Sequence, residues 1–335
     1  MIFDGHNDAL SRVLRGGPAA PAGFLAGDGE GHLDLPRAVA GGLAGGCFAV
    51  FTHPPARADY DTGAYFAAVD PEAALRGALA QVALLLAWER DGGGRLRVVR
   101  RAADLRGAGL AAVLHVEGAE PIDPGLDALH VLHAAGLRSL GLTWSRPNAF
   151  ATGVPFEFPG SPDQGPGLTA AGRALVRACG ELGVLVDLSH LNAAGFWDVA
   201  GLSDAPLVAS HSGAHALCPS PRNLTDDQLR AIGASGGLVG INFHVGFLRA
   251  DGADDPATPL AAVADHAAHV AAVAGVDAVA LGSDFDGATM PAALRDARAL
   301  PAVLAALAAQ GFDAGELERI AHGNWHRVLA ATWKS

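Results

Sequence analysis

The chain begins MIFDGHND (residues 1–8), and this stretch indicates both an architecture and a chemistry. An apolar start followed directly by His6-Asn7-Asp8 is typical of a buried strand that ends in polar residues. Side chains two apart on an extended chain point to the same side, so we expect His6 and Asp8 to lie side by side. An imidazole beside a carboxylate suits a divalent metal, although one such pair alone is better explained as a polar strand end.

Seven further short apolar segments follow, and most are continuously apolar, as in strands that are buried on both faces. The predicted strands are residues 2–6, 46–51, 111–117, 139–144, 184–190, 206–211, 237–243 and 278–284. Ala- and Leu-rich stretches between them predict helices over 71–91, 125–135, 169–182, 191–201, 224–233, 258–274, 292–309 and 314–332. Thr169 and Thr225 are predicted to be N-caps of two of these helices. His130 and His266 lie in helical stretches and are expected at the surface.

Eight strands that alternate with helices in 335 residues predict an α/β fold, a single (β/α)8 TIM-type barrel of the metal-dependent hydrolase kind. A doubly wound open sheet is the competing arrangement. We expect residues 1–335 to form one metallohydrolase domain. Segments rich in Gly, Pro and Asp predict long loops around 13–34, 53–70 and 145–168.

The composition limits the classes of partner. Half of the residues are hydrophobic and 17% are charged, which is a globular composition, and the formal charge of −12 argues against nucleic acid or an anionic membrane as a partner. The cysteines Cys47, Cys179 and Cys218 form no Cys-x-x-Cys pair, so we expect them to be reduced and buried. No apolar run is long enough to cross a bilayer and no secretory leader precedes His6, so a cytoplasmic location is expected.

Metal-ligand residue types follow several of the other predicted strands. The residues at these strand ends are Glu117, His190, His211 and Asp284. Because the carboxyl ends of barrel strands converge on one face, these side chains are predicted to meet His6 and Asp8 there. A polar strand end is a sufficient explanation for each residue alone, but it is a poor explanation for six of them in one register.

The number of ligand types fits a two-metal site. Two divalent ions about 3.5–4 Å apart need a bridging carboxylate and a few terminal ligands. Glu117 is the candidate bridge, with His6 and Asp8 completing one site and His190 and His211 the other. Nitrogen-rich ligation favours Zn²⁺, two ions per chain, over magnesium or calcium. Asp284 then remains for proton transfer, with Asp286, two residues later, as the alternative.

The short motifs, taken in order, resemble the membrane (renal) dipeptidase family of zinc peptidases, bacterial branch. They are DGHND at 4–8, HVEG at 115–118, DLSH at 187–190, SHS at 210–212, Arg222-Asn223, GSDFDG at 282–287 and GNW at 323–325. The resemblance implies an amidohydrolase-type barrel in which His6, Asp8 and Glu117 bind one zinc and Glu117, His190 and His211 bind the other. It further implies that Asp284 is the catalytic aspartate and that Arg222 pairs with the C-terminal carboxylate of the substrate.

The implied activity is hydrolysis of the peptide bond of dipeptides by a metal-bridging hydroxide, with tolerance for a D-residue at the C-terminal position left open. The alternative is an N-acyl-D-amino-acid deacylase or another amidohydrolase-type reaction on the same binuclear site, and a non-catalytic binding protein is a third hypothesis. A homodimer is compatible with the resemblance, although no motif indicates an interface. The mammalian members carry a substrate-contacting His where this chain has Trp144. Trp144, Arg146 and Asn148 are therefore the candidates for that substrate contact.

Overall fold

The computed structural model describes residues 1–16, 20–53 and 64–334. It contains a nine-stranded sheet in the order β1-β2-β4-β5-β6-β7-β8-β9, with β3 paired to β4. All of these pairings are parallel. The strands are β1 Ile2–Asn7, β2 Leu43–Phe51, β3 Leu96–Val98, β4 Leu110–Glu117, β5 Leu137–Gly141, β6 Leu185–Asp187, β7 Val208–Ser212, β8 Leu238–Ile241 and β9 Val279–Leu281.

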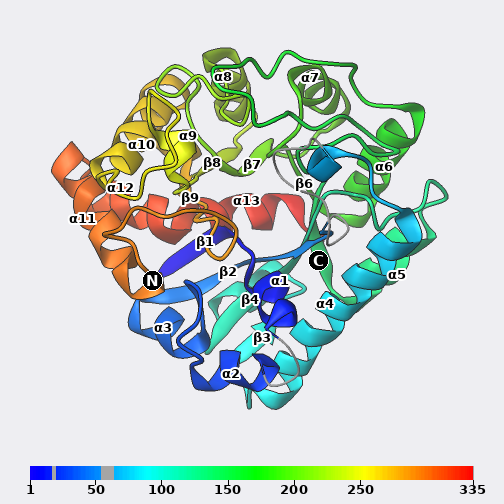
Figure 1. Cartoon of the computed structure of the whole chain (residues 1–335), viewed down its shortest axis with the longest axis horizontal. Coiled ribbons are helices and arrows are strands. Elements are labelled where there is room, and N and C mark those ends of the chain that lie inside the picture. Colours follow the sequence, from blue (N-terminus) through cyan, green and yellow to red (C-terminus); the bar gives the residue numbers. More distant parts are fainter. Residues whose placement is uncertain (17–19, 54–63, 335) are drawn as a thin grey trace.

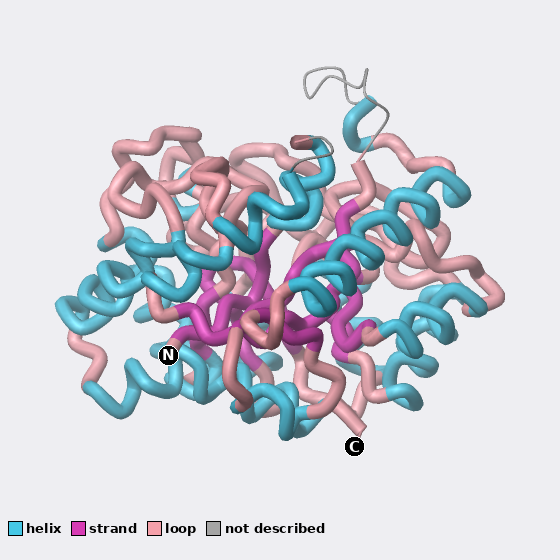
Figure 2. The backbone as a smooth tube through the Cα atoms, turned by 90° about the horizontal axis from the view of Figure 1, so that it is seen from below, coloured by secondary structure: helices cyan, strands magenta, loops and turns pink. Residues whose placement is uncertain are grey.

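The first and last strands of the barrel meet at the rim that carries their carboxyl ends. Asn7 forms a parallel bridge with Phe285. The backbone N–H of Asp8 donates to the carbonyl of Phe285 over 2.7 Å, and that of Asp284 donates to the carbonyl of His6 over 3.0 Å. The strands therefore lie at the centre with helices around them (Figures 1 and 2). The barrel prediction is confirmed, and the open sheet is excluded.

The helices surround the sheet, and most of the predicted ones are present. They are α1 Ala9–Arg15, α2 Ala20–Ala26, α3 Leu35–Ala40, α4 Pro71–Asp91, α5 Asp127–Ala135, α6 Ala170–Leu182, α7 Ala193–Leu202, α8 Asp226–Ala234, α9 Val245–Leu248, α10 Ala261–Ala274, α11 Leu300–Gln310, α12 Ala314–Glu318 and α13 Asn324–Thr332. Both predicted caps are confirmed, since Thr169 accepts a hydrogen bond from Gly172 N and Thr225 forms a capping box with Gln228.

The predicted loops differ in how well they match the structure. The segment 145–168 contains no helix and no strand, as expected. The prediction for 13–34 was wrong in part, because α1 extends to Arg15 and α2 lies inside this segment. Within 53–70, residues 54–63 lie outside the described part of the chain, and Ala64–Phe66 form a 3₁₀ turn.

The end of the barrel opposite the carboxyl ends of the strands is closed by α13. Trp325 on this helix packs its ring 5.5 Å from that of Phe3 and donates its indole N–H to the carbonyl of Leu281 over 3.0 Å. A Cβ at Gly5 would overlap both the carbonyl of Ser210 and the ring of Trp325, so only glycine fits at this point of β1. The apolar filling of this end leaves the opposite rim for polar side chains.

Buried groups outside the rim confirm one prediction and correct another. All three cysteines are buried and free. His266, expected at the surface, is buried on α10, where its Nδ1 accepts from Ala214 N over 2.9 Å and its Nε2 lies 3.1 Å from the carbonyl of Leu248.

Among the described residues, no helix has both the length and the apolar character that crossing a membrane requires.

Candidate metal centre

Six strand-end residues from distant parts of the chain meet at one rim of the barrel. His6 lies in β1, Glu117 ends β4 and His211 lies in β7, whereas Asp8, His190 and Asp284 follow their strands by one to three residues. Three overlapping groups have ligand atoms within 4.8 Å of one another: His6, Asp8 and Glu117; Glu117, His190 and His211; and His6, His211 and Asp284. The structure thus brings together all six residues that the sequence placed here.

The two carboxylate oxygens of Glu117 face different partners. Its Oε1 lies 3.0 Å from Nε2 of His190 and 3.5 Å from Nε2 of His211. Its Oε2 lies 3.7 Å from Nε2 of His6, and that nitrogen lies 3.4 Å from Oδ2 of Asp8. Glu117 therefore separates two sets of donors, which is the arrangement that a bridging carboxylate between two cations requires.

The donor atoms fit a divalent metal on two grounds. Both ring nitrogens of His6 are buried and have no hydrogen-bond partner among the described residues, a condition that is costly for a buried polar group without a bound ligand. The Nε2 atoms of His190 and His211 lie only 3.0 Å apart, and both face the same carboxylate. Imidazole nitrogens and carboxylates in this ratio are a donor set that zinc prefers.

Burial sets the protonation of the histidines. It lowers the pKa of His190 and of His211 well below 6.5, so both rings are neutral and able to bind a metal at neutral pH. Burial alone would also lower the pKa of His6, but the carboxylates of Glu117 and Asp8 outweigh it and raise this pKa to about 10. Burial raises the pKa of Glu117 to about 8. The carboxylates thus favour a positive charge at the position of His6.

Hydroxyl groups hold the outer nitrogens of two of the histidines. Nδ1 of His190 lies 2.8 Å from Oγ of Ser145, and Nδ1 of His211 lies 2.8 Å from Oγ of Ser210. Ser210 in turn donates to Oδ2 of Asp187 over 2.5 Å. Contacts of this kind fix the ring orientation and leave Nε2 free for a metal.

Asp284 lies at the edge of this cluster in a conformation that its neighbours fix. Its φ of 63° is left-handed, which is uncommon for a residue with a side chain. Its Oδ2 accepts a hydrogen bond from Nδ2 of Asn242 over 3.0 Å. A Cβ at Gly287 would overlap the carboxylates of Asp8 and Asp284, so a glycine is needed where these two side chains come together.

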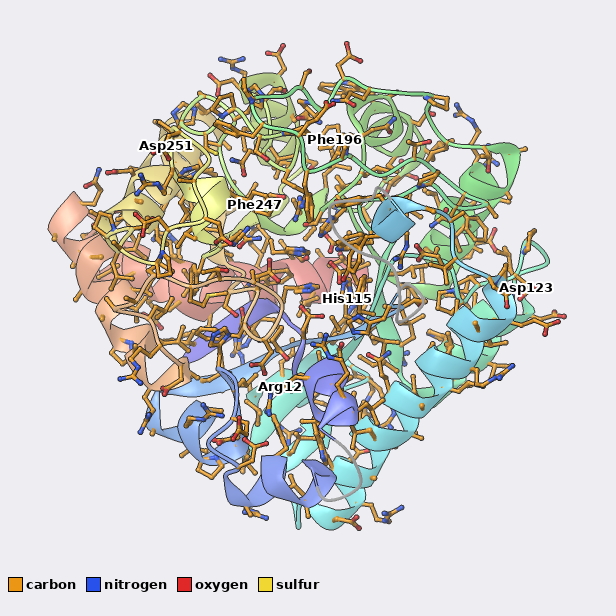
Figure 3. The ribbon with its side chains drawn as sticks, viewed as in Figure 1. Arg12, His115, Asp123, Phe196, Phe247 and Asp251 are labelled. Carbon is orange, nitrogen blue, oxygen red and sulfur yellow. The ribbon has the colours of Figure 1, made fainter. Side chains whose placement is uncertain are left out.

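A cavity of about 480 Å³ opens onto these residues. One wall is aromatic and is formed by Phe51, Tyr65, Trp144, Phe156 and Phe247. The acidic residues Asp8, Glu117, Asp284 and Asp286 also line the cavity, although the Asp286 side chain itself is buried. Trp144 lies within the aromatic wall, its ring stacked 5.5 Å from that of Phe66. Figure 3 shows Phe247 and Arg12 on opposite sides of the barrel centre, near which His115 lies.

Arg222 is buried next to this cluster and is only partly satisfied. Its Nη2 donates to the carbonyl of His211 over 3.0 Å, whereas its Nε and Nη1 have no partner among the described residues. Its guanidinium lies over the ring of Phe247, 5.4 Å from the centroid. Burial lowers the pKa of Arg222 to about 10, which still leaves it charged at neutral pH. A charged guanidinium with unpaired N–H groups is suited to bind a carboxylate.

The structure does not bring Asn148 to the cavity. Its Nδ2 donates to the carbonyl of Leu142 and its Oδ1 accepts from the N–H groups of Phe150 and Ala151, so the side chain stabilises its own loop. Asn148 lines a separate cavity instead, so the position of its side chain does not support a substrate contact. Arg146 is buried behind the aromatic wall, paired with Glu120 over 2.7 Å.

Sequence reasoning missed several residues that hold the ligands. Asn242 directly follows strand β8, so the strand-end rule that gave the other residues would have found it. Asp187, the last residue of β6, satisfies the same rule. Ser145 and Ser210 carry no comparable signal, because hydroxyl groups occur throughout the chain.

The model of the membrane dipeptidase family (peptidase family M19) matches residues 1–334. The chain belongs to this family. It is a metallodipeptidase, and its closed barrel with a cluster of metal-ligand residues agrees with that assignment.

Solved relatives have the same fold over almost the whole chain. A metallopeptidase from Rhodobacter sphaeroides, liganded with a phosphinate mimic of the dipeptide L-Ala-D-Ala, is 47% identical, with a TM-score of 0.95 and 99% of each chain covered. A structure described as dipeptidase AC of the same family is also 47% identical, with a TM-score of 0.93 over 100% of this chain and 99% of the other.

A relative is also found by sequence. An uncharacterised protein from the pqqA 5′ region of Klebsiella pneumoniae is 48% identical over 76% of this chain and 95% of its own length.

Proposed function

We propose that this metallodipeptidase uses two zinc ions, bound by His6, Asp8, Glu117, His190 and His211, to hydrolyse the peptide bond of dipeptides. The observation that carries the proposal is the position of Glu117, whose two oxygens face separate sets of donors. When bound, such a pair of ions would supply a hydroxide at neutral pH and polarise the scissile carbonyl.

The protein's own groups orient the substrate and move the proton. Arg222 has two free donors for the C-terminal carboxylate of a dipeptide, and the ring of Phe247 covers its guanidinium. Asn242 donates to Oδ2 of Asp284, so Oδ1 is the oxygen that accepts the proton of the attacking hydroxide and returns it to the leaving amine. The aromatic wall, including Trp144, limits the access of water to the reacting groups.

We also propose that the enzyme accepts a D-residue at the C-terminal position. The support is the Rhodobacter relative, which is 47% identical over 99% of both chains and binds a mimic of L-Ala-D-Ala. A library of dipeptides with L- and D-residues at each position, assayed with zinc-loaded and chelator-treated enzyme, tests this proposal. Preference for N-acyl-D-amino acids over dipeptides would favour the deacylase alternative.

Asp284→Asn tests the proton transfer. The asparagine cannot take up a proton, so we expect this variant to bind zinc like the wild type and to lose a factor of about 10²–10⁴ in turnover. A variant with near wild-type rates would remove Asp284 from the mechanism.

The remaining proposals concern location and assembly. Three free, buried cysteines support a reducing compartment, and we propose a cytoplasmic location on that basis. The homodimer stays a prediction that light scattering would test.

A further inference from the structure

A group of buried charges lies beside the candidate metal centre, between helix α1 and the segment that follows β9. Its central residue is Asp286, whose side chain is fully buried. Nε of Arg12 donates to Oδ2 of Asp286 over 3.0 Å, and the backbone N–H of His32 donates to Oδ1 over 2.5 Å. The N–H of Asp286 donates to Nδ1 of His32 over 2.9 Å. Both oxygens and the amide of Asp286 are therefore bonded.

Arg12 connects this carboxylate to the part of the chain that carries the first ligands. Its backbone N–H donates to the carbonyl of Asp8 over 3.0 Å, in the first turn of α1. Its guanidinium also donates to Asp28 over 3.1 Å and to the carbonyl of Leu33 over 2.8 Å. Arg12 therefore fixes Asp286, which is 274 positions away in the sequence, relative to Asp8.

Asp286 is separated from Asp284 by one residue, and both have left-handed backbone angles, with φ of 69° and 63°. Such angles are unfavourable for residues with a Cβ and persist only where surrounding contacts fix them. On the side of Asp284, the N–H of Asp284 donates to the carbonyl of His6, and the N–H of Asp8 donates to the carbonyl of Phe285. On the side of Asp286 they are the bonds to Arg12 and His32.

We infer that Asp286 is a positioning residue: held by Arg12 and His32, it keeps the Asp284 backbone in the conformation that aims its carboxylate at the metal-ligand cluster. This role rests on the proposed function, in which Asp284 carries the proton. It differs from direct proton transfer by Asp286, because both oxygens of Asp286 already accept hydrogen bonds.

The test compares Asp286→Asn, Arg12→Met and the double variant. We expect kcat for a dipeptide to fall by about 10- to 100-fold in each single variant, since small displacements of a catalytic group have effects of this size. KM should change less than about threefold and zinc content should equal that of the wild type, because the ligands and Arg222 are untouched. The double variant should be no worse than the worse single variant, because both changes remove one contact.

A second readout does not depend on activity. Amide hydrogen exchange over residues 282–289, measured in metal-free protein, should be faster in Asp286→Asn and in Arg12→Met than in the wild type. The exchange measurement also separates this inference from the proposed function. If the wild type hydrolyses no dipeptide, the proposed function fails, while unchanged exchange over 282–289 in the variants would overturn the positioning role.

Arg37→Met is the matched control. Arg37 contacts the same loop, through Asp28, Asp34 and the carbonyl of Gly31, but none of its recorded contacts is with Asp286. We expect this variant to lower the melting temperature while it keeps the kcat and the exchange rates over 282–289 of the wild type.

Two kinetic results with Asp286→Asn would also contradict the inference. A wild-type kcat in Asp286→Asn would show that the contact between Arg12 and Asp286 is only structural. A loss in Asp286→Asn as large as that in Asp284→Asn, with Arg12→Met unaffected, would make Asp286 the proton carrier. If Asp286→Asn does not fold, Arg12→Lys gives the same test, since it keeps the charge and loses the guanidinium geometry. A reduced kcat in that variant supports the inference, and a wild-type kcat contradicts it.

Discussion

The Nε2 atom of His190, three residues after β6, lies 3.0 Å from that of His211 in the neighbouring strand β7. Both face Oε1 of Glu117, and burial keeps both rings neutral by lowering their pKa. Two neutral imidazoles that converge on one carboxylate oxygen would form one half of the proposed binuclear site, and the other oxygen of Glu117 faces the second set of donors.

Glu117→Gln should affect both halves of the site at once. The amide has one acceptor and no charge, so it cannot bridge two cations. We expect the zinc content to fall below two per chain and dipeptide hydrolysis to fall by more than the roughly 100-fold that loss of an outer partner causes. Retention of two zinc ions per chain, measured by elemental analysis, would show that Glu117 is not the bridge.

Ser210→Ala should weaken zinc binding while the fold persists. Its hydroxyl joins Nδ1 of His211 to Asp187, and loss of such a contact typically reduces metal affinity about 10- to 100-fold. Competition with a fluorescent chelator measures the change. Ser203→Ala, at the end of α7, is the control, because the Ser203 hydroxyl accepts from Ala205 N away from the site. Equal affinities in the two variants would contradict a role for Ser210.

Asn242→Ala should lower kcat more than it raises KM. Its amide fixes one oxygen of Asp284, so its removal leaves the carboxylate free to rotate away from the reacting groups. A fall in kcat of about tenfold or more is expected. Steady-state kinetics at saturating zinc measure both constants, and an increase in KM alone would assign Asn242 to substrate binding.

Arg222→Met should abolish the distinction between a dipeptide and its C-terminal amide. The wild type is expected to prefer the free carboxylate, because the charged guanidinium of Arg222 has unpaired N–H groups that would bind it. Arg222→Lys keeps the charge without the fork and should retain part of the preference. A preference as strong in Arg222→Met as in the wild type would place the carboxylate elsewhere.

His266 should make the protein less stable in acid. Burial lowers the pKa of His266 from 6.5 to about 4, so between these values the unfolded chain binds a proton that the folded chain does not. The contribution of His266 to the free energy of unfolding is fully present above pH 6.5 and is lost as the pH falls to about 4. The total loss is about 3 kcal/mol. In urea unfolding across this pH range, the free energy of unfolding of His266→Gln should fall less steeply with decreasing pH than that of the wild type.

The control for this experiment is His130→Gln, because His130 is exposed on α5. A pH dependence of His266→Gln identical to that of the wild type would show that His266 does not cause the acid sensitivity.

The barrel and the ligand cluster could be predicted because both depend on local patterns. Buried parallel strands are continuous apolar runs, and their carboxyl ends share one rim, so Glu117, His190 and His211 could be assigned to one site without their distances. The sequence could not indicate that Arg12 bonds Asp286, because 274 positions separate them and an arginine on a helix is ordinary.

Other errors came from residues whose role is decided by packing. His266 lies in a helical pattern that predicts a surface position, yet it bonds the backbone of two other segments. Asn148 follows β5 and Trp144 along the chain, but its side chain bonds its own loop. The end of α1 and the whole of α2 lie in the segment 13–34, whose glycines and prolines predicted a loop.

The most direct test of the binuclear site is anomalous diffraction at the zinc edge from crystals of the zinc-loaded protein. We predict two peaks, one between His6, Asp8 and Glu117 and the other between Glu117, His190 and His211, so that the carboxylate of Glu117 touches both. A single peak, or two peaks of which one lies away from Glu117, would contradict the account.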